Sequence, residues 1–213
     1  MDIKSFGCSF IYGSELADDK GTRSDPSQLT WPALLSKQSD YGYQCYAQPG
    51  IGNLQIAEQV LNQSTDFALY IIGWTWIDRF DYVDSKDNQW VTILPVNTDS
   101  IATTYYKNMH SEYRDKLTTL MNIRLVIDTL QQKGYPFIMT FMDNLAFDTR
   151  WHTNTAILEL QDYVRPHMTC FDGMNFLDWS KEQGYPIGTA AHPLEQAHAA
   201  AAEYMLQLGI HKV

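Results

Sequence analysis

The sequence lacks several features that would place it in a specialised class of protein. No apolar run approaches the roughly 18 residues of a membrane-spanning helix, and the first residues, MDIKSF, carry neither a basic leader nor a long apolar stretch. Only three cysteines are present, an odd number that does not suit a disulfide framework. These absences predict a cytoplasmic protein with reduced thiols, no signal peptide and no membrane span.

Positive charge is also scarce, since 15 Lys and Arg stand against 25 Asp and Glu, for a net charge of −10. This balance argues against nucleic acid, and against an anionic membrane surface, as the main partner. No glycine-rich phosphate-binding motif of the G-x-G-x-x-G or Walker type occurs, so no nucleotide cofactor is expected. His192, Glu195 and His198 do not have the spacing of a zinc-binding HExxH motif, so no metal is predicted either.

The composition is that of a globular chain, because 45% of the residues are hydrophobic and 19% are charged. A chain of 213 residues can bury about 70% of its unfolded surface, which is enough to form one core without disulfide bonds or a structural metal ion. We therefore expect a single domain over residues 1–213. Residues 78–103 combine aromatic side chains, scattered acids and Pro95, and we expect them to form an irregular insert near these positions.

Gly and Pro punctuation alternates with apolar segments along the chain. The segment 67–72 is apolar throughout, which is typical of a strand buried on both faces of a parallel sheet. Strands are expected at 3–6, 44–47, 67–72, 137–141 and 168–171, and helices at 31–38, from Asn53, at 104–133, at 156–164 and from Pro193 to Leu206. This alternation predicts a parallel α/β sheet with its ligand crevice at the carboxyl ends of the strands.

Two short motifs at this predicted edge carry residues capable of chemistry. Ser9 follows the first strand in Gly7-Cys8-Ser9, and a sharp turn there exposes a hydroxyl for nucleophilic attack; the alternative is a serine that caps the next segment. His192 precedes Pro193 at the start of the last helix, whose positive end favours a neutral imidazole that can accept a proton. The alternative for His192 is a capping role alone.

In the order and spacing of these motifs, the chain resembles the SGNH/GDSL hydrolase superfamily over nearly its whole length. The matching blocks are Gly7-Cys8-Ser9 for G-D-S, Gly50-Ile51-Gly52-Asn53 for the second glycine block, Gly73-Trp74-Thr75-Trp76 for G-x-N-D, and Thr189-Ala190-Ala191-His192-Pro193 for D-x-x-H-P. The resemblance implies a three-layer α/β/α sandwich, flavodoxin-like, with a parallel five-stranded sheet.

The same resemblance implies roles for individual residues. Ser9 would be the nucleophile and His192 the base that takes its proton. The backbone N–H groups of Ser9 and Gly52 would form the oxyanion hole together with Thr75, which stands in the place of the family's Asn. The implied activity is that of a cofactor-free serine ester hydrolase of esterase, lipase or acetylesterase type.

The sequence departs from the family at the position of the triad acid, where Thr189 stands three residues before His192. Loss of the acid in Ser-His-Asp enzymes lowers kcat by about 10⁴. A backbone carbonyl, Asp172 or Asp178 are the alternatives for orienting His192, and without them we expect Thr189→Asp to raise kcat. Cys8 replaces the Asp of the first block, and its thiol is an alternative nucleophile if its pKa is depressed.

Aromatic residues gather directly after the third predicted strand. Trp74 and Trp76, with Asn53, are predicted to line the substrate site, and packing of the insert is the alternative for the two rings. The expected substrate is a small-molecule or carbohydrate ester. Two other functions remain open on this fold: a catalytically silent binding module, which the losses at Thr75 and Thr189 favour, and an acyl transferase with a water-excluding aromatic wall.

Overall fold

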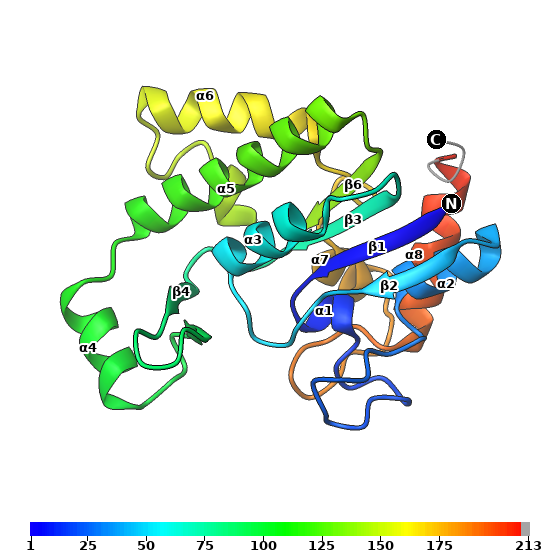
Figure 1. The fold of residues 1–213 in the computed structure, drawn as a ribbon, viewed down its shortest axis with the longest axis horizontal. Coiled ribbons are helices and arrows are strands. Elements are labelled where there is room, and N and C mark those ends of the chain that lie inside the picture. Colours follow the sequence, from blue (N-terminus) through cyan, green and yellow to red (C-terminus); the bar gives the residue numbers. More distant parts are fainter. Residues whose placement is uncertain (210–213) are drawn as a thin grey trace.

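A parallel sheet of four strands organises the computed structural model, which describes residues 1–209 (Figure 1). The strands are β1 (Asp2–Gly7), β2 (Gly42–Cys45), β3 (Leu69–Trp74) and β6 (Phe137–Phe141), in the spatial order β2-β1-β3-β6. All neighbouring pairs are parallel, so every connection within the sheet is a crossover. The predicted α/β class with a parallel sheet is confirmed.

The prediction of five strands is wrong for the part of the chain that the structure describes. Where a fifth strand would lie, Met168 forms a single parallel bridge to Met139, and the Thr169 N–H donates to the Met139 carbonyl at 2.7 Å. The chain leaves the sheet soon afterwards, because Asp172 and Gly173 both adopt left-handed backbone angles, with φ of 50° and 81°. The ladder therefore ends after one bridge.

Alternate residues of β3 point to opposite faces of the sheet, and each face is covered by helices (Figure 1). Leu69 and Ile71 belong to the apolar cluster under α2 (Trp31–Ser39), α7 (Phe176–Glu182) and α8 (Glu195–Gln207). Tyr70 and Ile72 belong to the cluster under α3 (Asn53–Gln63), α5 (Glu112–Lys133) and α6 (Thr155–Val164). This is the predicted three-layer sandwich.

Several helix boundaries differ from the predictions because polar caps define them. The helix expected over 104–133 is two helices, α4 (Ser100–Asn108) and α5, each starting after a capping side chain, Asp99 and Ser111 respectively. α7 lies in a segment expected to be a loop, and Asn175 caps it. The last helix starts at Glu195, after Pro193.

The remaining short elements are α1 (Ser9–Tyr12), η1 (Asn144–Phe147) and η2 (Arg165–His167). Within residues 1–209, no helix combines the length and the apolar character needed to cross a bilayer.

The expected irregular insert is a regular structure. It contains the antiparallel hairpin of β4 (Phe80–Val83) and β5 (Trp90–Ile93), followed by the start of α4. The hairpin and α4 share a small apolar cluster of their own, centred on Ile93, Ala102 and Tyr105. In Figure 1 this unit projects from the sandwich beyond the start of α3.

Asp81 of β4 attaches the hairpin to the sandwich. Its buried carboxylate accepts hydrogen bonds from the N–H groups of Gly52 (2.9 Å) and Gln55 (3.0 Å) and from the Thr92 hydroxyl (2.5 Å). Burial raises the pKa of Asp81, and these hydrogen bonds oppose that effect. Position 52 must be glycine for this approach, because a Cβ there would lie 2.6 Å from the carboxylate.

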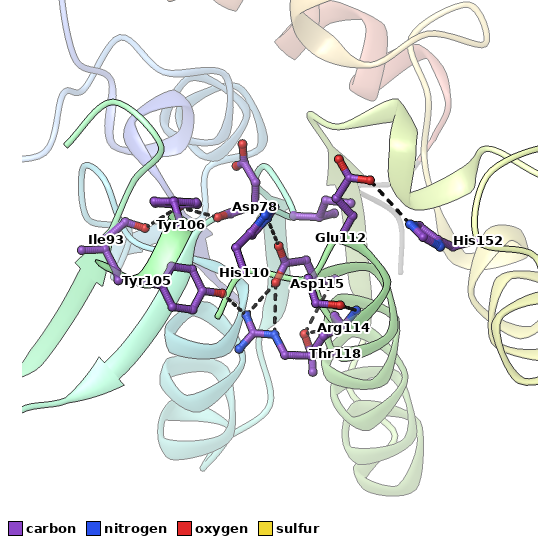
Figure 2. Close-up of polar contacts among 12 residues, drawn as sticks. Asp78, Ile93, Tyr105, Tyr106, His110, Glu112, Arg114, Asp115, Thr118 and His152 are labelled. Carbon is purple, nitrogen blue, oxygen red and sulfur yellow. Dashed lines mark hydrogen bonds and ion pairs between the residues drawn. The ribbon is translucent and has the colours of Figure 1, made fainter. Parts of the chain in front are cut away.

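A second attachment joins the insert to α5 (Figure 2). The side chain of Asp115 is buried and receives the guanidinium of Arg114 at 2.6 Å and the His110 Nε2 at 2.8 Å. Arg114 also donates to the Tyr105 hydroxyl of α4 at 2.8 Å. The Tyr106 hydroxyl donates to the carbonyl of Asp78 at 2.7 Å, so both ends of the insert are fixed.

We predict that Asp81→Ala lowers the free energy of unfolding by about 2–4 kcal/mol, because two buried N–H groups lose their acceptor. Urea denaturation measures the change. Asp87→Ala is the control, since Asp87 is exposed at the hairpin turn and bonds only to the Gln89 N–H. We expect the control to change stability by no more than about 0.5 kcal/mol. Equal losses in the two variants would contradict the attachment by Asp81.

Candidate active site

Ser9 and Thr75 follow the neighbouring strands β1 and β3 and lie at the same carboxyl edge of the sheet. The register pairs Gly7 with Gly73, and Ser9 and Thr75 each follow two residues later. Gly7 has a φ of 151°, and a Cβ at this position would lie 2.8 Å from the Gly73 carbonyl oxygen. Glycine therefore lets the chain turn away from β1 while β3 passes close beside it.

Ser9 and His192 meet at this edge although 183 residues separate them. The Ser9 Oγ lies 2.8 Å from the His192 Nε2. Both side chains are largely enclosed, with 8% of Ser9 and 13% of the His192 side chain exposed. The Gly188 N–H donates to the His192 carbonyl at 2.7 Å and closes a tight turn, and the Phe10 ring packs edge-on against the imidazole at 5.0 Å. The imidazole is therefore held in place from two sides.

Glu15 provides the carboxylate that the sequence analysis did not find. Its Oε2 lies 2.7 Å from the His192 Nδ1, so Ser9, His192 and Glu15 form one continuous hydrogen-bonded chain. Glu15 comes from the loop after α1, at the opposite end of the sequence from the position that Thr189 occupies in the family pattern. The carboxylate that contacts His192 therefore comes from a different segment than the family pattern indicates.

The turn before His192 surrounds the Glu15 carboxylate with donors. The Thr189 hydroxyl donates to Oε1 at 2.7 Å, and the Ala190 N–H donates to the same carboxylate at 3.0 Å. The Thr189 hydrogen bond lowers the pKa of Glu15 more than burial raises it, and with the contributions of His192 and Ala190 the pKa falls to about 2. Glu15 is therefore ionised at neutral pH. A Cβ at Gly188 would lie 2.5 Å from Oε2, so glycine is required for this approach.

The acids proposed from the sequence do not contact His192. Asp172 accepts the Trp179 Nε1–H at 3.0 Å, and Asp178 accepts the amide groups of Asn144 and Asn175. α8 starts at Glu195, with Leu194 as its N-cap, so His192 lies two residues before the cap. The partner that orients His192 is the ionised Glu15.

His198 has a structural position away from the site. It is buried, its Nδ1 accepts the Trp31 N–H at the start of α2 at 3.0 Å, and burial lowers its pKa to about 3. Glu195 accepts the Ala17 N–H at 2.7 Å. Among residues 1–209, no group of three or more His, Cys, Asp or Glu side chains is arranged to hold a metal ion.

The predicted oxyanion hole is only partly available. The Gly52 N–H donates to Asp81, so the prediction for Gly52 is wrong in this structure. The N–H of Thr75 donates to the Asn53 side-chain oxygen at 2.9 Å. The Thr75 hydroxyl is buried and has no hydrogen-bond partner in the part of the chain that the structure describes.

Two of the three predicted substrate-binding residues are buried and contact other parts of the protein. Trp74 is 1% exposed and lies in the core cluster under α3 and α5, since it shares the face of Tyr70 and Ile72. Asn53 is buried, and its amide donates to the carbonyl of Thr75 at 3.2 Å. Neither is available to a substrate, so both predictions are wrong.

Trp76 differs from Trp74 because it is only half-buried. Its ring packs edge-on against Phe10 at 5.5 Å, and the Arg79 guanidinium lies over it at 5.0 Å. The Phe10 ring therefore contacts both Trp76 and His192. Cys8, the alternative nucleophile, is 1% exposed within the apolar core, where its thiol cannot reach a substrate.

Glu15 was not predicted because the family pattern places the acid in the segment before His192, where Asp172, Asp178 and Thr189 lie. The one available indication was that Glu15, Asp18 and Asp19 all follow the first strand and so lie near its carboxyl end. Sequence spacing does not distinguish these three acids as partners of His192. In the structure, Asp18 accepts hydrogen bonds from Ser27 and Gln28, and Asp19 accepts hydrogen bonds from Glu15 and Gly21 within the same loop, so only Glu15 of the three contacts His192.

Solved structures with this fold are esterases and related enzymes. The structure of TesA shares 14% identity over 97% of both chains, with a TM-score of 0.54. The acetyl xylan esterase Est2A from Butyrivibrio proteoclasticus shares 12% identity over 98% of this chain and 64% of its own, with a TM-score of 0.51. The psychrotrophic esterase EstA from Pseudoalteromonas sp. shares 8% identity over 97% of this chain and 96% of its own, with a TM-score of 0.50. No family model and no curated protein matches the sequence. The chain has the SGNH hydrolase fold that its sequence blocks predict.

The lowered pKa of Glu15 predicts a pH-dependent contribution to stability. The folded pKa is about 2 and the reference value is 4.5, so the unfolded chain binds the extra proton between these values. The contribution of Glu15 is complete above about pH 4.5 and is lost as the pH falls towards 2. We expect the stability difference between the wild type and Glu15→Gln, measured by urea denaturation, to shrink across this range. A constant difference would contradict the lowered pKa.

The position of Glu15 reverses the expectation for Thr189→Asp. The substitution replaces a hydrogen-bond donor to Glu15 with a second carboxylate, which raises the pKa of Glu15 and displaces it from His192. We now predict that Thr189→Asp lowers kcat about tenfold or more in ester hydrolysis, whereas Thr189→Ser, which keeps the hydroxyl, leaves it nearly unchanged. In a Glu15→Ala background the new carboxylate does not compete with Glu15 for the His192 Nδ1–H. Thr189→Asp should therefore raise kcat in that background. The same direction of change in both backgrounds would rule out this arrangement.

Proposed function

We propose that this chain is a serine ester hydrolase whose catalytic triad is Ser9, His192 and Glu15. The observation that carries the proposal is the continuous chain of two short hydrogen bonds, 2.8 Å from Ser9 to His192 and 2.7 Å from His192 to Glu15. A shared fold does not by itself imply shared chemistry, so the activity depends on the geometry of the site.

The geometry supports a two-step acyl transfer to water. His192 Nε2 takes the proton from the Ser9 hydroxyl while Oγ attacks the ester carbonyl carbon. When the tetrahedral intermediate collapses, the bond to the alcohol breaks, and His192 returns the proton to the departing alcohol. Water then attacks the acyl-enzyme in the same manner, its proton passes through His192 to Ser9 Oγ, and the carboxylic acid is released.

Glu15 fixes the state of the imidazole that these steps require. Because an ionised carboxylate can only accept, the proton of neutral His192 resides on Nδ1, and Nε2 is left free to accept the Ser9 proton. The imidazolium that forms during attack is then stabilised by the negative charge 2.7 Å away. The low pKa of Glu15 keeps that charge in place throughout the cycle.

The oxyanion is assigned to the Ser9 N–H and the Thr75 hydroxyl. Ser9 is the first residue of α1, where helical N–H groups lack partners in the preceding turn. The unpartnered Thr75 hydroxyl belongs to the neighbouring strand end. An oxyanion donor is worth about 3 kcal/mol, and Gly52 is left out of this assignment because its N–H donates to Asp81.

The proposal explains the triad better than a silent binding module would. A binding module needs no ionised carboxylate behind an imidazole that faces a serine hydroxyl. Here three separate segments, with two glycines that allow close approach at positions 7 and 188, bring these groups together. Binding alone does not account for this cost in backbone conformation.

Labelling with a fluorophosphonate probe tests the nucleophile. We expect the probe to attach to Ser9 and the wild type to hydrolyse short p-nitrophenyl esters. Ser9→Ala should abolish both, and Glu15→Gln should lower kcat by about 10⁴ because the charge is lost. Ser14→Ala is the matched control, a serine in the same loop outside the triad. Labelling that persists in Ser9→Ala, or no labelling of the folded wild type, would refute the proposal.

A further inference from the structure

Asn53, the first residue of α3, holds the backbone of Thr75 through both of its polar groups. The Asn53 side-chain oxygen accepts the Thr75 N–H at 2.9 Å, and its NH₂ group donates to the Thr75 carbonyl at 3.2 Å. A longer contact of 3.5 Å joins the same NH₂ group to the Trp76 carbonyl. One side chain therefore fixes the segment that directly follows β3, which ends at Trp74.

Asn53 is itself held by α5 and by the hairpin. Its NH₂ group donates to the Thr119 hydroxyl oxygen at 3.2 Å, and Asp81 accepts the N–H of the preceding Gly52 at 2.9 Å. The side chains of Asn53, Thr75 and Thr119 are all buried. Only one orientation of the amide satisfies these partners, because the reversed one would set its oxygen against the Thr75 carbonyl.

The direction of the Thr75 hydroxyl depends on this hold. A β-branched side chain has few allowed rotamers for a given backbone, so fixing both backbone groups of Thr75 restricts where its Oγ1 points. The hydroxyl makes no hydrogen bond among residues 1–209. No polar partner of its own therefore orients it, and its position follows from the backbone.

We propose that Asn53 is a positioning residue of the hydrolase, which directs the Thr75 hydroxyl at the oxyanion without touching the substrate. This role rests on the proposed function, in which Thr75 is an oxyanion donor. A donor held in place before the reaction stabilises the developing charge without reorganisation, so its effect belongs to the transition state. Loss of Asn53 should therefore lower kcat and leave KM nearly unchanged.

The alternative role for Asn53 is to stabilise the start of α3 and nothing more. Two buried backbone groups of Thr75 lose their partner in either case, so a lower stability does not distinguish the two roles. A double-mutant cycle with Thr75→Val does distinguish them, because valine has nearly the shape of threonine and lacks the hydroxyl.

Kinetics of p-nitrophenyl ester hydrolysis, on variants that urea denaturation shows to be folded, test the role. We expect Thr75→Val to lower kcat about 100-fold and Asn53→Ala about tenfold, each with KM changed less than about twofold. In the Thr75→Val background, Asn53→Ala should lower kcat by no more than about a further twofold. Asn62→Ala is the matched control and should leave kcat unchanged in both backgrounds, since Asn62 is an exposed asparagine of the same helix that donates to Glu58.

Thr119→Val provides a second measurement should Asn53→Ala not fold. It removes the acceptor of the Asn53 amide and leaves Asn53 and Thr75 unchanged. We expect kcat to fall about threefold, and this effect too should vanish in the Thr75→Val background. The pH dependence of kcat/KM should remain that of the wild type, because none of the substituted side chains titrates and His192 keeps its partners.

The outcomes separate the positioning role from the hydrolase. An unchanged kcat in Thr75→Val or Asn53→Ala, a fall of equal size in both backgrounds, or a shifted pH profile would overturn the role of Asn53 and retain the hydrolase. A folded wild type that hydrolyses no ester and is not labelled at Ser9 would remove the hydrolase and the role of Asn53 together.

Discussion

The carboxylate of Glu15 is the interaction on which the geometry of the site depends. It joins the loop after β1 to the turn before α8 through His192, Thr189 and Ala190. Neither segment is regular secondary structure, so sheet and helix packing alone do not fix their relative position. One ionised group with several donors gives this region a single arrangement, and the 2.8 Å contact between Ser9 and His192 follows from it.

The insert is fixed by the same kind of interaction at a second place. Asp81 accepts hydrogen bonds from the start of α3 and from β5. Asp115 pairs with Arg114 and His110 beside α4. Because both carboxylates are buried, their partners are structural requirements rather than solvent-exposed pairs of little energetic weight. The hairpin thereby holds Trp90 beside a cavity that the 48–51 loop and Gln55 of α3 also line.

The sheet was predictable because strand ends and helix starts are encoded locally. The unbroken apolar run of β3 and the alternating order of segments specify a parallel sheet, and the strand ends then place Ser9 and Thr75 at the same edge. The burial of Trp74 was predictable as well, since it has the same parity as Tyr70 and Ile72 and so faces the helices. The prediction for Trp74 failed because its position after the apolar run was weighed and its parity was not.

The role of Glu15 was not predictable in the same way. Its contact with His192 spans 177 residues and depends on left-handed backbone at Gly13, at Glu15 itself and at Ala191. No periodicity specifies such angles outside glycine, and three acids share the loop. The engagement of Gly52 by Asp81 is similar, because it depends on how an insert docks and not on the motif that contains Gly52.

The contact between Glu15 and His192 joins two distant segments of the chain. In the D-x-x-H arrangement the acid and the base share one short loop and move together, whereas here each belongs to a different end of the chain. His192 stands just before α8, which packs on α2 through the His198 contact with Trp31. Ala197, Ala201 and Met205 of α8 lie in the core cluster, so the packing of this helix also fixes the position of His192 relative to Ser9 and Glu15.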